Sequence, residues 1–69
     1  MEEMTPKMKR IHSHLTDTPT LAYDIAQAAE VDNQSAGSVL VALEQRGMAG
    51  RQKDEESGVW LWYRAELPQ

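Results

Sequence analysis

The sequence contains no cysteine. This absence excludes disulfide bridges, thiolate zinc sites, iron–sulfur clusters and a cysteine nucleophile. No apolar run approaches the roughly 20 residues that are needed to cross a bilayer. The first residues, Met1-Glu2-Glu3, are acidic where a signal peptide would be basic. We therefore expect a cytoplasmic protein that has no membrane partner.

The sequence also has fewer basic than acidic side chains. Seven Lys and Arg residues stand against eleven Asp and Glu residues, which gives a formal net charge of -4. This overall sign is unfavourable for a nucleic-acid partner. The 69 residues suffice for a single domain, 1–69. A domain of this size buries only about 60% of its unfolded surface, so we expect no large cavity and no cofactor.

The first predicted helix covers about residues 6–15. Thr5 is suited to cap its free amides, and Pro6 fits the first helical position, where its missing N–H costs nothing. A repeat at i, i+3 and i+7 then forms one apolar stripe, which consists of Met8, Ile11 and Leu15.

The second predicted helix covers about residues 21–29. Pro19 disfavours helix at the residue before it, so the chain breaks there. Thr20 is expected to cap the new helix. The side chains expected to face inward are Leu21, Ile25 and Ala28 or Ala29.

The third predicted helix covers about residues 33–46, with Asp32 as its N-cap and Gly47 as its stop. One face, within about 100° of arc, is apolar and should turn to the core. It consists of Ala36, Val39, Leu40 and Leu43. The opposite side carries Gln34, Ser38, Val41 and Gln45.

After Gly47 the pattern changes from helical to alternating. Residues 48–53 and 59–64 are predicted to be two strands, joined by a polar loop at 54–58. The whole chain therefore has an α+β, mostly helical organisation that ends in a β-hairpin, spanning about 48–64.

Two short helices that are joined by a tight turn and followed by glycine and a hairpin resemble the winged helix-turn-helix family. The stretch that begins Thr20-Leu21 is similar to the opening of that family's second helix, and Val31 stands where the family has the apolar residue of its turn. Leu40, Leu43 and Gly47-Met48 fall on the "L-x-x-L-x-x-x-G-L" that ends its third helix. The resemblance covers most of the chain. It implies a three-helix fold with the C-terminal hairpin as its wing.

The resemblance implies a small regulator that reads double-stranded DNA with its third helix in the major groove. Arginines and lysines beside that helix would neutralise phosphates, although pairing with the acids of the chain explains them equally well. The expected DNA-binding residues are Asn33, Gln34, Ser35, Ser38, Arg46, Arg51 and Lys53.

An alternative is a winged-helix adaptor that binds protein and not DNA. No residue on the outer side of the third helix is basic, and the loop Asp54-Glu55-Glu56 would repel a phosphate backbone. Gly37 has no side chain, so a protein or nucleic-acid backbone can approach that helix closely at this position. The small winged-helix proteins of bacterial ferrous-iron transport are similar in size, but without their cysteines no iron–sulfur role carries over.

The last strand is apolar on both faces. Val59, Leu61 and Tyr63 alternate with a second set, Trp60, Trp62 and Arg64. One set must complete the core. The charge of Arg64 favours its own set as the outer one, and these three residues are a candidate protein interface for a homodimer. The alternative is that both tryptophans pack the hairpin against the first helix.

Nothing in the sequence indicates an enzyme. His12 and His14 would point about 200° apart on a helix, so we expect no shared metal ion. No serine, histidine and acid form a catalytic set, and no phosphate-binding glycine loop is present. We therefore expect no catalytic residue.

Overall fold

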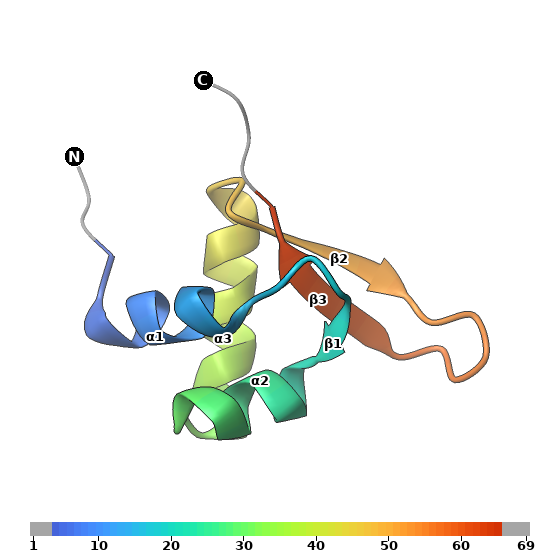
Figure 1. Cartoon of the computed structure of the whole chain (residues 1–69), viewed down its shortest axis with the longest axis horizontal. Coiled ribbons are helices and arrows are strands. Elements are labelled where there is room, and N and C mark those ends of the chain that lie inside the picture. Colours follow the sequence, from blue (N-terminus) through green and yellow to red (C-terminus); the bar gives the residue numbers. More distant parts are fainter. Residues whose placement is uncertain (1–3, 66–69) are drawn as a thin grey trace.

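The computed structural model describes residues 4–65, where three helices and three short strands form one unit (Figure 1). The helices are α1 (Pro6–His14), α2 (Ala22–Ala29) and α3 (Asn33–Gln45). The strands are β1 (Thr20–Leu21), β2 (Ala49–Lys53) and β3 (Trp60–Arg64). Each helix, and the hairpin as a whole, differs from its predicted range by one residue at one end.

The strands form an antiparallel sheet in the order β1-β3-β2. Thr20 pairs with Trp62 and Leu21 with Leu61, while Arg51 lies opposite Trp62 on the other side of β3. Strand β1 is not among the predicted elements. A strand of two residues has no periodicity of its own, and it forms because β3 offers an edge to the segment before α2.

The helix N-termini follow local capping rules in two cases. The side chain of Thr5 accepts from the amide of Met8, and that of Asp32 accepts from the amide of Ser35, as predicted. The predicted cap on α2 is wrong. Thr20 belongs to β1 and its hydroxyl donates to the carbonyl of Thr18 at 2.8 Å, so α2 begins after Leu21 with no side-chain cap.

The core lies where the three helices meet the base of the hairpin. Its buried members are Met8, Ile11, Leu15, Ile25, Ala26, Ala29, Ala36, Leu40, Leu43, Ala49 and Trp62. The predicted stripes of α1 and α3 are therefore confirmed, with Val39 only partly buried at their margin. The predicted inward position of Leu21 is wrong. Its pairing with Leu61 turns it to the outer sheet face, where it is 40% exposed.

The hairpin of β2 and β3 projects away from the helices, and its loop is the part most distant from them (Figure 1). The helices cover only one face of the sheet, because Ala49 and Trp62 are buried while their neighbours Gly50, Leu61 and Tyr63 stay partly accessible. This arrangement leaves three surfaces for function: the outer side of α3, the loop and the outer sheet face.

Candidate nucleic-acid interface

The turn between α2 and α3 fixes the angle of the two helices. Glu30 adopts a left-handed conformation with φ 59, and the amide of Val31 donates to the carbonyl of Ala26 at 2.9 Å. This bonding pattern ends a helix in a single residue. Val31 is partly buried and packs against the core, as the family resemblance implies.

Two cations of α1 lie near acidic side chains of the turn. Lys7 Nζ lies 4.0 Å from Asp32 Oδ1, and Arg10 Nη2 lies 4.0 Å from Glu30 Oε1. Hydrogen bonds from the amide and then the hydroxyl of Ser35 lower the pKa of Asp32, to which the charge of Lys7 adds. The start of α3 is therefore ordered by its own cap, and Lys7 of α1 lies beside the capping carboxylate.

The outer side of α3 is open over its whole length. Gln34, Ser38, Val41 and Gln45 are exposed, as predicted from the helical period. Three of these four side chains carry hydrogen-bonding groups, and the fourth, Val41, is apolar and 40% exposed. Such a surface offers donors and acceptors to a partner, together with one apolar contact.

The predicted base-reading residues do not all lie on that surface. Asn33, Gln34 and Ser38 are exposed on α3. Ser35 is half-buried on the flank, where its hydroxyl accepts from Lys7 Nζ at 3.3 Å. Ser35 is thus engaged with α1 as well as with the cap of α3.

Gly37 lies in the middle of α3 at the edge of this surface. A Cβ atom added to Gly37 would meet nothing within 4 Å. Packing inside the domain therefore gives no reason for a glycine here, although glycine in a helix interior costs about 1 kcal/mol relative to alanine.

The predicted phosphate contacts come from the end of α3 and from the hairpin. Arg46 is exposed at the C-cap of α3, and Lys53 is exposed at the end of β2. Arg51 is engaged, because its Nε lies 3.2 Å from Glu44 Oε2 and its guanidinium lies over the ring of Trp60.

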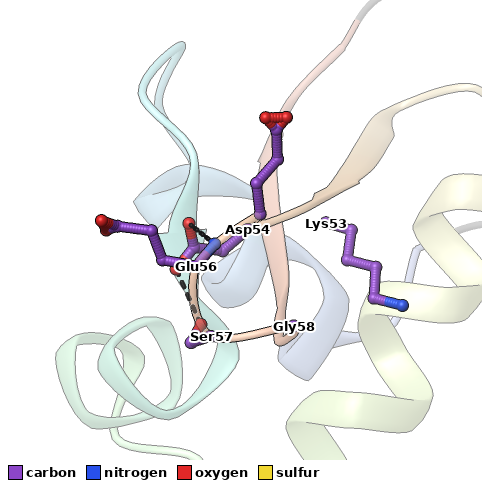
Figure 2. A pocket seen from close by; sticks show the side chains of 6 residues that line it. Lys53, Asp54, Glu56, Ser57 and Gly58 are labelled. Carbon is purple, nitrogen blue, oxygen red and sulfur yellow. Dashed lines mark hydrogen bonds between the residues drawn. The ribbon is translucent and has the colours of Figure 1, made fainter.

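The loop of the hairpin surrounds an open hollow lined by Lys53 and the residues up to Gly58 (Figure 2). Asp54 Oδ2 accepts from the hydroxyl of Ser57 at 2.7 Å, and this bond lowers the pKa of Asp54. Lys53 extends away from the carboxylates of Asp54 and Glu56 (Figure 2). The loop is held closed by its own side chains and presents mainly negative charge.

The predicted outward position of Trp62 is wrong. Trp60, Trp62 and Arg64 share the sheet face that turns to the helices, and Trp62 is only 6% exposed in the core. Trp60 is 47% exposed because it lies beyond the helices, and Arg64 is exposed at the other end of β3. The large indole of Trp62 completes a core that three short helices do not fill.

The outer sheet face is the surplus apolar face. It carries Leu21, Val59, Leu61 and Tyr63, with Leu21 40% and Val59 41% exposed. Tyr63 covers Gly50 so closely that any Cβ there would collide with its ring. Alternation along β3 identified this set, but not which set turns outward.

Residues 4–65 have neither of two other features that would indicate a function. No group of three or more His, Asp or Glu side chains in this range is placed to hold a metal ion. No helix in the same range is long and apolar enough to span a membrane. His14 is exposed on α1 and His12 is half-buried.

Comparison with known proteins establishes the fold. The chain is similar to the crystal structure of the transcriptional regulator SlyA, with a TM-score of 0.74 and 22% sequence identity over 91% of this chain. The match covers 45% of that regulator, so the chain spans about half of its length. No family model and no curated protein matches the sequence. The chain has the winged helix-turn-helix fold, which confirms the predicted fold class.

Proposed function

We propose that this winged helix-turn-helix domain binds duplex DNA with α3 in the major groove and acts in the regulation of transcription. The observation that carries the proposal is the open, hydrogen-bonding outer side of α3, in a fold shared with the transcriptional regulator SlyA. A B-DNA major groove admits an α-helix, and each base pair presents distinct donors and acceptors there.

The exposed side chains suggest separate roles. The amides of Asn33 and Gln34 are suited to bind adenine edges, and the hydroxyl of Ser38 is suited to donate to a phosphate. Ser35 orders the start of α3 through its contacts with Asp32 and Lys7. Arg46 and Lys53 are the cations we assign to phosphates beside α3.

The experiment is binding of the chain to duplex DNA at low and moderate salt. We expect affinity for mixed-sequence duplex that falls as salt rises, because released counterions drive the association. Lys53→Ala should weaken binding to every sequence and flatten the salt slope by about one unit. An unchanged slope would remove Lys53 from the phosphate contacts.

Base reading is tested on a preferred duplex selected from a random library. Gln34→Ala should lose about 1 to 3 kcal/mol on that duplex and much less on mixed sequence. Gln52→Ala is the matched control, because Gln52 is an exposed amide on the outer sheet face. Equal losses for Gln34→Ala on both duplexes would show that Gln34 does not read bases.

A protein-binding adaptor is the second candidate, and the pairing of cations with acids favours it. Lys7, Arg10 and Arg51 each lie within 4.0 Å of a carboxylate oxygen. Paired cations have less charge to offer to phosphates, and the acidic loop around Glu55 and Glu56 repels phosphates. Absence of DNA binding even at low salt would support the adaptor and contradict the first candidate.

A further inference from the structure

Arg51 of β2 lies between side chains of two other elements. Its Nε is 3.2 Å from Oε2 of Glu44 in the last turn of α3. Its Cζ is 4.7 Å from the ring centre of Trp60 and 5.9 Å from that of Trp62, both on β3. One guanidinium therefore links the recognition helix to both strands of the wing.

The three contacts join parts of the molecule with different degrees of burial. Trp62 is fixed in the core, whereas Trp60 lies further along the projecting hairpin and is 47% exposed. The side chains of Arg51 and Glu44 are 43% and 32% exposed. The link thus lies where the hairpin leaves the helices, and there a small change of angle moves the loop furthest.

The chemistry of these contacts requires arginine. A planar guanidinium stacks on an aromatic face while its N–H groups donate in the plane to a carboxylate. A lysine ammonium keeps the charge but cannot hold both contacts in that geometry. The charge of residue 51 and its linking role are therefore separable by Arg51→Lys.

We propose that Arg51 is a positioning residue that holds the wing at a fixed angle to α3, and that Glu44 and Trp60 are its partners in this role. This differs from the phosphate contact that the sequence suggests for Arg51. The consequence for DNA rests on the proposed function, but the link itself is a property of the free protein.

The first test measures quenching of tryptophan fluorescence by acrylamide in the free protein. The two tryptophans give a protected component from Trp62 and an accessible one from Trp60. Arg51→Lys and Glu44→Gln should each change the quenching constant of the accessible component by about twofold, and the double variant should match either single one. Glu55→Gln, which removes an exposed loop charge, should leave it unchanged.

The link is contradicted if the quenching constant of the accessible component is the same as in the parent in both single variants. It is also contradicted if the effects of the two single variants add in the double variant. Folding of each variant is checked by the protected Trp62 component, which lies in the core and should not move. A protected component that becomes accessible in Arg51→Lys or Glu44→Gln would also contradict the proposal, because the whole core and not the wing angle would then depend on the pair.

The second test uses DNA and separates positioning from phosphate contact. A positioning role predicts that Arg51→Lys and Glu44→Gln both weaken duplex binding by about threefold with an unchanged salt slope. A phosphate contact predicts that Arg51→Lys binds like the parent and that Glu44→Gln binds more tightly, which would overturn the proposal. If the parent binds no DNA, the proposed function fails, and the fluorescence test still decides the role of Arg51.

Discussion

Glu30 adopts a left-handed backbone conformation that a residue with a side chain disfavours. Both helices of the helix-turn-helix end with the same bond pattern, from Val31 to Ala26 and from Met48 to Leu43, each at 2.9 Å. The left-handed residue is Gly47 in the second case and Glu30 in the first. Glycine adopts this conformation without strain, so the end of α2 carries a backbone strain that the end of α3 avoids.

We expect Glu30→Gly to stabilise the fold by roughly 0.5 kcal/mol, because relief of left-handed strain exceeds the added entropy of the unfolded chain. The lost contact with Arg10 is exposed and weak. Urea unfolding measures the change, with Gly47→Ala as the opposite substitution, which should destabilise. A Glu30→Gly protein that unfolds at lower urea would show that the contact with Arg10 and the added entropy of the unfolded chain together outweigh the strain.

Asp32 makes the stability of α3 depend on pH. Its folded pKa lies below the ordinary value of 3.8 because the Ser35 amide donates to the carboxylate. The stabilisation is therefore complete above the unfolded pKa and is lost as the pH falls through the folded pKa. Asp32→Asn should keep the cap and flatten the acid limb of a pH series of thermal unfolding. An identical acid limb in both proteins would exclude Asp32 as its source.

At the scale of elements, α3 has a buried side and an open side with different requirements. Leu40 and Leu43 are fully buried. We expect Leu40→Ala and Leu43→Ala each to destabilise by about 2 to 5 kcal/mol, through lost burial and the cavity that remains. Val41→Ala on the open side should change stability by less than about 0.5 kcal/mol. Equal urea midpoints for all three variants would contradict this division of the helix.

Gly37 connects the stability of α3 to binding. Because its Cβ position is empty, Gly37→Ala should raise stability by about 1 kcal/mol without disturbing the core. If a DNA backbone approaches α3 there, the same methyl group should weaken duplex binding. Urea unfolding and DNA binding, measured on the same preparation, show whether stability rises and whether DNA affinity falls. Unchanged DNA affinity in the stabilised variant would place the DNA elsewhere on α3.

At the scale of the whole molecule, the dimer expected from the sequence stays a prediction, and the structure changes the variant that tests it. The surplus apolar surface is the outer sheet face with Leu21, Val59, Leu61 and Tyr63. A dimer would add the burial that a small domain lacks and would supply two copies of α3 for a two-fold DNA site.

Sedimentation of the parent should therefore show self-association at high concentration, which Val59→Glu abolishes while the domain stays folded. Trp62→Glu is not a test of the interface, because it places a charge in the core and should unfold the domain. Val41→Glu is the matched control, because Val41 is a valine of nearly equal exposure (40% against 41%) that lies on α3 and not on this sheet face. A parent that stays monomeric at all concentrations would contradict the prediction.

The sequence by itself determined the helices, the hairpin and most of the core. Caps at Thr5 and Asp32, the stop at Gly47 and the apolar periods of α1 and α3 act between residues a few positions apart. Such interactions are readable from spacing alone. The exposed outer side of α3 followed from the same period.

Only the tertiary structure decided which face of β3 turns inward, where β1 forms and what Arg51 contacts. Alternation places Trp60 and Trp62 on one face but leaves its direction open, and Arg64 suggested the wrong one. Burial depends on which face meets the helices, and the indole of Trp62 fills that space. The pairing of Leu21 with Leu61 and of Arg51 with Glu44 joins segments distant in sequence or in different elements, so no local pattern encodes it.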